Sequence, residues 1–169
     1  MGSTVAASAK TKLGTRDMTY IAVFAVLMAI CSWISIPEMP PFTMVPFTMQ
    51  TFAVFLAVGV LGGRRGTLAV LVYLLLGAVG APVFAHFTGG LGILLGTTGG
   101  YLIGFLFTAL EMWGMERLLG RKTWALALSM VLGMIAYDVF GTAWYMVVYA
   151  RTTAPIGLGT ALLWCVVPF

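Results

Sequence analysis

The chain has 169 residues, of which 61% are hydrophobic and only 8% are charged, and its mean hydropathy is +1.05. Soluble domains carry roughly 25% charged residues, so this composition excludes an ordinary soluble domain and predicts a membrane protein. The formal net charge is +4, but the basic residues form no stripe of the kind that binds nucleic acid, and we expect no nucleic-acid partner.

Residues 1–16 are small, polar and basic, and they are predicted to form a disordered cytoplasmic tail. The rest of the chain, residues 17–169, is predicted to be a single transmembrane helical domain in the lipid bilayer. Its apolar runs cover residues 18–36, 45–62, 66–85, 91–113, 123–150 and 155–169. Because a transmembrane helix needs ~20 apolar residues, these runs predict an all-α membrane protein, a compact bundle of about six transmembrane helices.

Basic residues fall on one side of this alternating topology. They are Lys10, Lys12 and Arg16 before the first run, Arg64 and Arg65 after the second, and Arg117, Arg121 and Lys122 after the fourth. Arg151 is the only basic residue predicted on the opposite side. Because cytoplasmic loops carry an excess of lysine and arginine, both termini are predicted to be cytoplasmic, in a multi-pass protein of the plasma membrane.

The stretch GGLGILLGTTGGYLIGF, residues 89–105, repeats glycine at every fourth position, at Gly92, Gly96, Gly100 and Gly104. A phosphate-binding loop would end in Gly-Lys-Ser/Thr, and this stretch has no lysine. Two interpretations stay open. The glycines can form one helical face on which a neighbouring helix packs closely. Alternatively, Thr97, Thr98 and Gly99 can form a partly open helix start that lines a pocket.

Several motifs resemble one known family over nearly the whole chain after the tail. They are VPFTMQTFAV (45–54), GGRRGTLAVLVYLLLGAVGAPVFA (62–85), GGLGILLGTTGGYLIGF (89–105), YDVFGTAWY (137–145) and the closing VVPF (166–169). Together they resemble the BioY family, the biotin-specific S components of energy-coupling-factor (ECF) vitamin transporters. The resemblance implies a membrane subunit that captures biotin from outside. It would deliver biotin inward with a transmembrane coupling subunit and two cytoplasmic ATPase subunits.

Two alternatives to this function stay open. Within transport, the alternative is an S component for a different vitamin, such as thiamin or riboflavin. In another class, the alternative is an intramembrane enzyme, but Ser32, Ser35 and Ser129 lie in no nucleophile motif, and His86 has no evident partner. We therefore expect no enzymatic activity, no metal and no cofactor. The absence of a Walker motif means that ATP-driven work would belong to partner subunits.

The resemblance and the topology together predict a largely apolar pocket with a few polar groups at the outward ends of the helices. A proline-containing loop, residues 37–44, is expected to cover it. The expected polar contacts are Thr48, Gln50, Thr88, Thr98, Tyr101 and the backbone of Gly89, Gly90 and Gly99. The expected ring contacts are Phe42, Phe84, Phe87, Tyr137 and Trp144, because flat aromatic faces give a large contact area.

Asp138 is a carboxylate near the middle of the fifth run. An unpaired carboxylate at that depth costs at least ~2.5 kcal/mol, so its side chain should face the interior with a polar partner or a proton. A substrate-binding role and a structural role both stay open for it.

Ala22, Ala25 and Ala29 form a small-residue strip on the first run. The pair Ala25-xxx-Ala29 resembles the motif by which S components meet the coupling subunit, and small residues allow helices to approach closely. We therefore predict a coupling interface at this strip.

The sixth run ends at Phe169. From Ile156 it spans only ~21 Å at ~1.5 Å per residue, less than the ~30 Å of a hydrocarbon core. In the family, the closing Pro-Phe is followed by an acidic residue and a lysine that help to hold biotin. We therefore expect the sixth helix to be truncated in this sequence, and the natural protein to continue with such a pair.

Overall fold

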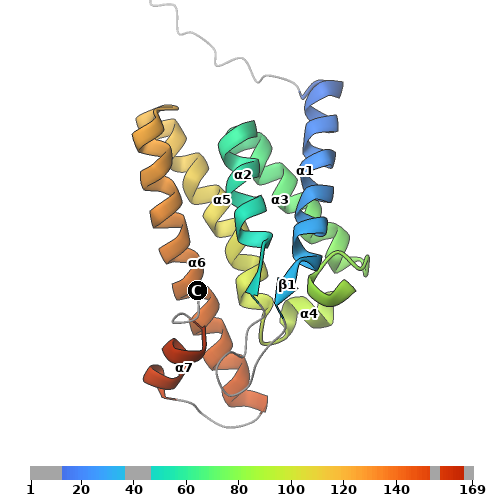
Figure 1. Ribbon diagram of the computed structural model, residues 1–169, viewed down its shortest axis with the longest axis vertical. Coiled ribbons are helices and arrows are strands. Elements are labelled where there is room, and N and C mark those ends of the chain that lie inside the picture. Colours follow the sequence, from blue (N-terminus) through green and yellow to red (C-terminus); the bar gives the residue numbers. More distant parts are fainter. Residues whose placement is uncertain (1–12, 37–46, 153–156, 166–169) are drawn as a thin grey trace, which may run out of the picture.

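The computed structural model describes residues 13–36, 47–152 and 157–165, and the described chain is almost entirely helical (Figure 1). In chain order, the elements are α1 (Thr15–Trp33), β1 (Ser35–Ile36), β2 (Phe47–Thr48), α2 (Gln50–Leu61), α3 (Gly63–Ala78), the 3-10 turn η1 (Ala85–Phe87), α4 (Leu91–Leu95), α5 (Gly99–Leu119), α6 (Thr123–Thr152) and α7 (Leu158–Cys165). The two short strands pair antiparallel. Helices α1, α2, α3, α5 and α6 form the bundle, and α7 packs against α6.

Helix α1 begins inside the segment that we predicted to be a disordered tail. The backbone N–H of Gly14 donates to Asp17 Oδ2 at 3.2 Å, so an acidic side chain in the first turn caps the start of the helix. The predicted boundary at residue 16 is therefore wrong, because α1 already starts at Thr15. Residues 1–12 lie outside the described part of the chain.

The expectation of six long spans is too simple. Among the described residues, only α1 and α6 are long and apolar enough to cross a membrane by length and composition. The predicted run 45–62 forms α2 of only 12 residues, about 18 Å long, because β2 occupies the residues just before it. The run 155–169 contains α7, which has eight residues. The described chain holds seven α-helices of unequal length.

The predicted fourth run, residues 91–113, is broken between α4 and α5. Gly96 ends α4 in an extended conformation, with φ −75° and ψ −174°, and α5 begins at Gly99. The four regularly spaced glycines therefore do not share one helical face, and that interpretation is wrong for the stretch as a whole. Close packing does occur within α5, where a Cβ added at Gly100 would lie 2.2 Å from Trp144 Cβ on α6.

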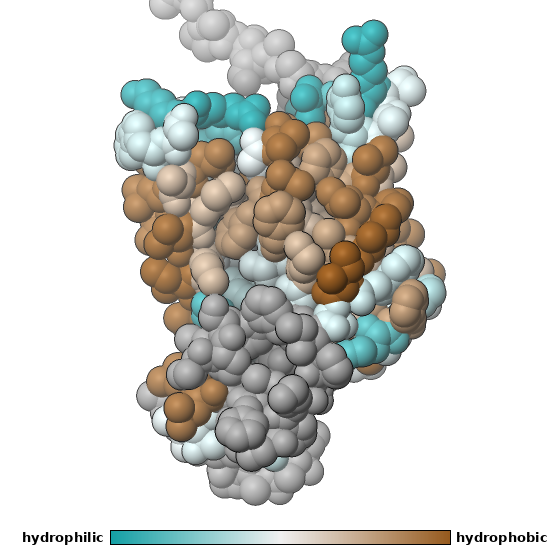
Figure 2. Space-filling view, viewed as in Figure 1, coloured by the Kyte–Doolittle hydropathy of each residue, from teal (hydrophilic) through white to brown (hydrophobic). Residues whose placement is uncertain are grey.

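Basic side chains gather at one end of the bundle, which we call the basic end. Arg65 at the start of α3 pairs with Asp17 on α1 at 2.9 Å. Arg121, after α5, donates to the carbonyl oxygen of Gly59 near the end of α2 at 2.8 Å. The first bond joins α1 to α3, and the second joins the turn after α5 to α2. Figure 2 shows the hydrophilic cap of this end above a hydrophobic belt. The predicted one-sided arrangement of the charges in this region is thus present in the fold.

Small residues bring the helices of the main core close together. Ala53 and Ala57 on α2, Ala69 on α3 and Ala109 on α5 are fully buried, which lets neighbouring backbones approach. Large apolar side chains face outward instead, as expected of a lipid-facing surface. They include Val23, Val26 and Ile30 on α1 and Val131, Ile135 and Val139 on α6.

The three alanines of the predicted coupling strip, Ala22, Ala25 and Ala29, do not share one exposed face of α1. Ala25 is 2% exposed and Ala29 is 5% exposed, and both belong to the main core. Their small side chains serve the packing of α1 against helices of this same chain, chiefly α3 and α2. Ala22 alone lies on the surface. Of the three predicted residues, only Ala22 is therefore available to a partner on the surface of α1.

Candidate functional site

A cavity of about 220 Å³ lies at the end of the bundle opposite the basic end. Its wall is built by the β2–α2 junction, the loop after α3, the break between α4 and α5, and one face each of α5 and α6. The lining residues are Thr48, Gln50, Phe84, Ala85, His86, Thr88, Ile93, Thr98, Tyr101, Leu102, Phe105 and Tyr137. Aromatic and apolar walls with a few hydroxyl and amide groups are typical of small-molecule sites.

Irregular backbone supplies much of this wall. Thr98 occupies the N-cap position of α5, but its side chain makes no capping hydrogen bond. In a membrane, backbone outside helices is tolerated where it is buried in protein or lines a cavity. The helix break therefore fits the interpretation of an open helix start beside a pocket.

A chain of hydrogen bonds fixes the polar part of the cavity. The side-chain amide of Gln50, which is buried, donates to the hydroxyl of Tyr73. The Tyr73 hydroxyl in turn donates to the carbonyl oxygen of Val83 at 3.0 Å, and the Thr48 hydroxyl donates to Gln50 Oε1 at 3.2 Å. Because buried networks of satisfied groups hold a single geometry, Gln50 is held in place before any ligand arrives.

Aromatic rings form the opposite part of the wall. Phe105 on α5 and Tyr137 on α6 stack with ring centroids 4.9 Å apart, and Tyr101 lies 5.2 Å from the same Tyr137 ring. Phe84 fills a slot beside Gly77, where an added Cβ would lie 2.0 Å from Phe84 Cζ. The rings are thus fixed by one another and by a glycine that leaves room for them.

The loop after α3 is tied to the end of α1. The Ser32 hydroxyl lies 2.7 Å from the carbonyl oxygen of Val83, and Trp33 Nε1 donates to the carbonyl oxygen of Pro82 at 3.1 Å. The ring of Phe87 stacks on Trp33 with centroids 4.8 Å apart. The end of α1 and this part of the cavity wall therefore form one connected unit.

Seven predicted contacts line the cavity: Thr48, Gln50, Phe84, Thr88, Thr98, Tyr101 and Tyr137. The sequence analysis missed Ala85, His86, Ile93, Leu102 and Phe105 as lining residues. Leu102 and Phe105 follow Thr98 at helical spacing, so the periodicity of one helix face could have revealed them. His86 was considered in the sequence only for enzymatic or metal chemistry. Its position in the wall of a pocket was not predicted.

The predicted glycine contacts have a different role, because none of the three lines the cavity. A Cβ added at Gly89 would lie 2.2 Å from the carbonyl oxygen of Ala81. One added at Gly99 would lie 1.8 Å from a carbonyl oxygen of α4, and Gly90 N–H donates to a carbonyl of α3. Gly89 and Gly99 therefore allow the backbone to pass closely, whereas Gly90 adopts a φ of +101° that favours glycine. Their predicted contact with a ligand stays a prediction.

Three further predicted contacts also lie off the cavity. The Phe87 ring stacks on Trp33 and remains 64% exposed. Trp144 Nε1 donates to the carbonyl oxygen of Gly96 at 3.0 Å. Asp138 is partly exposed and makes no hydrogen bond or ion pair within the described chain. Because Tyr137 faces α5, the next residue on the helix is turned away by about 100°. The expected inward position and polar partner of Asp138 are therefore not found.

The predicted contact Phe42 and the rest of the loop 37–44 lie outside the described residues.

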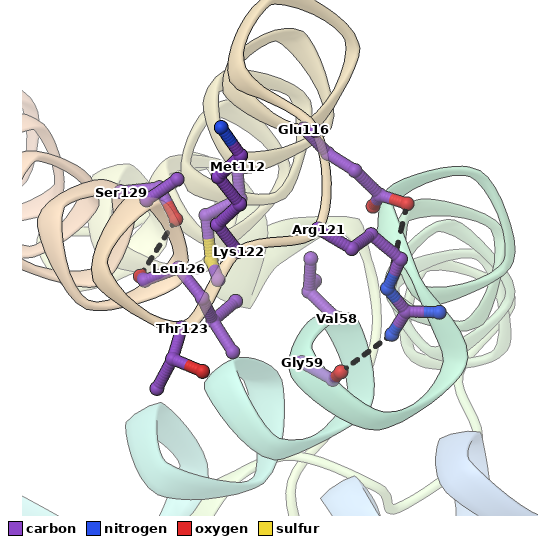
Figure 3. Close-up of a pocket in the computed structure, with 11 residues that line it drawn as sticks. Val58, Gly59, Met112, Glu116, Arg121, Lys122, Thr123, Leu126 and Ser129 are labelled. Carbon is purple, nitrogen blue, oxygen red and sulfur yellow. Dashed lines mark hydrogen bonds and ion pairs between the residues drawn. The ribbon is translucent and has the colours of Figure 1, made fainter.

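A second cavity, of about 200 Å³, lies at the basic end (Figure 3). Three of its polar side chains, those of Glu116, Arg121 and Ser129, bond other groups of the protein. Arg121 bonds the Gly59 carbonyl oxygen and pairs with Glu116 at 3.7 Å, and the Ser129 hydroxyl donates to the Leu126 carbonyl oxygen at 2.8 Å. These bonds hold helix ends together, so the cavity at the other end is the better candidate for ligand binding.

Comparison with known proteins gives consistent matches. The sequence profile of the BioY family matches residues 5–169. The biotin transporter BioY of Thermotoga maritima is 44% identical over 147 residues, which are 87% of this chain and 71% of that protein. The biotin transporter BioY2 of Lactococcus lactis subsp. cremoris is 39% identical over 76% of this chain and 68% of that protein. A crystal structure of the S component for biotin from an ECF-type ABC transporter superposes with a TM-score of 0.74, at 28% identity, over 88% of this chain and 78% of that chain.

Proposed function

The chain belongs to the BioY family, and we propose that it is the biotin-binding S component of an ECF-type ABC transporter. The observation that carries the proposal is the cavity at the end opposite the basic end, in a fold similar to that of a biotin S component. The family resemblance inferred from the motifs is confirmed by the match over residues 5–169. The relatives are transporters, and the chain is a transport subunit and not an enzyme.

The chemistry of the cavity suits biotin. Biotin has a ureido ring that needs hydrogen-bond partners, an apolar sulfur-containing ring and an anionic carboxylate. The Gln50 amide and the Thr98 hydroxyl are suited to the ureido group. The packed aromatic rings of Tyr101, Phe105 and Tyr137 are suited to the apolar ring. Thr48, Phe84 and Thr88 complete the proposed contacts on the side of the loop after α3.

The proposed orientation places the basic end in the cytoplasm and the cavity toward the outside of the plasma membrane. The support is the positive-inside bias, since Arg65 and Arg121 lie at one end while Arg151 lies in the last turn of α6, at the other. Biotin would then enter from outside. ATP hydrolysis by two cytoplasmic ATPase subunits, joined through a transmembrane coupling subunit, would drive its delivery inward.

The coupling subunit is proposed to contact the outer face of α1. A shallow apolar groove runs along this face, lined by Ala22, Val23, Val26, Leu27 and Ile30. The small side chain of Ala22 lets a second helix approach closely, which is how helices associate within membranes. This surface replaces the buried Ala25 and Ala29 as the proposed point of contact.

The function is tested by ligand discrimination on the purified chain. We expect calorimetric titration to show tight binding of biotin and none of thiamin or riboflavin. The variant Phe105→Leu should weaken biotin binding about tenfold, because it removes an aromatic face from the cavity wall. The matched variant Phe107→Leu changes a 49% exposed ring on the same helix and should leave affinity unchanged.

Binding of thiamin or riboflavin in preference to biotin would contradict the proposal. Equal effects of the Phe105 and Phe107 variants would show instead that biotin binds away from this cavity.

A further inference from the structure

Glu111 on α5 is a carboxylate inside the bundle. Both of its side-chain oxygens are buried, and neither has a hydrogen-bond partner within the described part of the chain. The residue lies about 12 Å before the end of α5 at Leu119, at ~1.5 Å per residue. Because the hydrocarbon core of a membrane is ~30 Å thick, this depth lies in the apolar layer and not among the headgroups. Ionisable residues at such a depth are rare, and they commonly have a function.

The carboxylate of Glu111 lies where α2, α5 and α6 meet. A Cβ added at Gly133 on α6 would lie 3.2 Å from Glu111 Oε2 and 3.5 Å from Phe55 Cε1 on α2. The missing side chain of Gly133 therefore leaves room for the carboxylate. Thr108, one turn earlier on α5, donates its hydroxyl to the Gly133 carbonyl oxygen at 3.0 Å. This hydroxyl is thus bonded to α6 and brings no hydrogen bond to Glu111.

The two helices that meet α5 at Glu111 bring no positive charge to it. Helix α2 contains no titratable residue. The half of α6 nearest the basic end, residues 123–136, contains none either. The next titratable residues on α6 are Tyr137, which lines the cavity at the other end, and Asp138, which is itself acidic. Neither of them can compensate a negative charge on Glu111.

The basic residues beyond these two helices are engaged or exposed elsewhere. Those at the end of α5 and at the start of α3 are Arg64, Arg65, Arg117, Arg121 and Lys122. Arg65 and Arg121 form the bonds of the basic end described above, and Arg117 lies 4.3 Å from the centroid of the Trp113 ring. Arg64 and Lys122 are exposed. Glu111 therefore forms no ion pair within the described residues.

We propose that Glu111 is a proton-binding site inside the bundle, occupied while α2, α5 and α6 are packed together. A buried charge without a partner is very unfavourable, and a bound proton removes the charge without any further ligand. Release of the proton requires water to reach the carboxylate, and water reaches it only when α6 or α2 moves away from α5. The site therefore couples proton binding to the packing of these helices. Glu111 does not line the candidate biotin cavity, and the inference does not depend on biotin binding.

Infrared spectroscopy of the purified chain detects the bound proton, because a protonated carboxyl group and a carboxylate absorb in separate bands. At neutral pH, the unaltered chain should show a carboxylic acid band that Glu111→Gln lacks. Glu116→Gln is the matched control on the same helix. The Glu116 carboxylate pairs with Arg121 at 3.7 Å, so its replacement should remove carboxylate absorption and leave the acid band in place. Loss of carboxylate absorption alone in Glu111→Gln would show that Glu111 is ionised, and would overturn the proposal.

Isotope labelling gives the same answer without any substitution. The glutamates of the chain are Glu38, Glu111 and Glu116. With ¹³C in the glutamate side chains only, their bands shift away from those of the aspartates, including Asp138. The labelled, unaltered chain should show both a carboxylic acid band and a carboxylate band at neutral pH. A carboxylate band alone would overturn the proposal even if Glu111→Gln failed to fold.

Thermal unfolding at several pH values tests the coupling to helix packing. Glutamine has nearly the shape of the neutral acid, so Glu111→Gln should change the melting temperature at neutral pH by less than about 2 °C. Raising the pH should destabilise the unaltered chain, because ionisation of Glu111 leaves a charge without a partner between the helices. Glu111→Gln cannot ionise there, and its melting temperature should fall at least about 3 °C less over the same pH range. An equal fall in both proteins would contradict the coupling of the proton to packing.

Discussion

The two ends of the bundle differ in how their helices are connected. At the basic end, helices meet through short turns such as the one at Gly62, whose φ is +84°, and bonds such as Arg65–Asp17 join neighbouring elements. At the opposite end, helices stop early, and a short hairpin, a 3-10 turn and a helix break enclose a cavity. At the basic end, polar side chains around the second cavity bond helix ends to one another, whereas at the other end irregular backbone lines the first cavity.

This difference shows how a small membrane protein can combine rigidity with binding. A regular helix satisfies its own backbone hydrogen bonds and has little polar surface to offer a ligand. Interrupting helices only around the cavity exposes such groups, while the closely packed end holds the helices in register. We therefore expect substitutions at the basic end to affect stability, and substitutions at the cavity end to affect binding.

The largest expected effect is on stability at the basic end. A Cβ at Gly63 would lie 2.5 Å from Trp113 Cα, so Gly63→Leu should force α3 and α5 apart. Overpacking of this kind costs ~1–3 kcal/mol or more, and we expect a strong fall in thermal stability and in the yield of monodisperse protein. The control Gly114→Leu places the same side chain where an added Cβ meets nothing within 4 Å. Equal loss in both variants would remove the distinction between packed and open glycines.

A second substitution tests a surface that belongs to neither end. Ala22→Trp fills the groove on the outer face of α1 and should block approach of the coupling subunit. We expect biotin binding and thermal stability to be kept, while ATP-dependent uptake by the assembled transporter is lost. Uptake at the normal rate in this variant would exclude the groove as the coupling surface.

The smallest expected effect concerns a single hydroxyl in the cavity. Thr98→Val keeps the shape of the side chain and removes one neutral hydrogen-bonding group, worth about 0.5–1.5 kcal/mol. Biotin affinity should fall by a factor of roughly 2 to 10, with an unchanged melting temperature. Thr97→Val is the matched control, because Thr97 is the adjacent threonine and does not line the cavity. If both variants bind biotin equally well, Thr98 has no contact with the ligand.

Much of the architecture could be predicted from the sequence, because membrane burial leaves a strong signal. Long apolar runs give α1 and α6 directly, and the basic residues mark one end. The break at Gly96 could not be predicted, because regularly spaced glycines are compatible with one continuous packing face. Periodicity reports which residues can share a face only when the helix is unbroken.

The cavity was predicted in outline and less well in detail. Residue type pointed to Gln50, Thr98 and Tyr101, which line it. Trp144 was predicted as a ring contact but does not line the cavity, because a tryptophan that fills the gap beside Gly100 looks the same in sequence as one that faces a ligand. His86 was not predicted to line the cavity, because its left-handed backbone, beside the contact of Phe87 with the distant Trp33, leaves no local sequence pattern.

The bonds from the end of α1 to the loop after α3 also have a mechanical consequence. Because Ser32 and Trp33 contact the loop at Val83 and Pro82, any displacement of α1 that preserves these bonds carries the loop with it. Helix α1 and this part of the cavity wall are therefore mechanically coupled. We infer that a partner bound on the outer face of α1 would reshape the cavity from a distance if it displaced the helix.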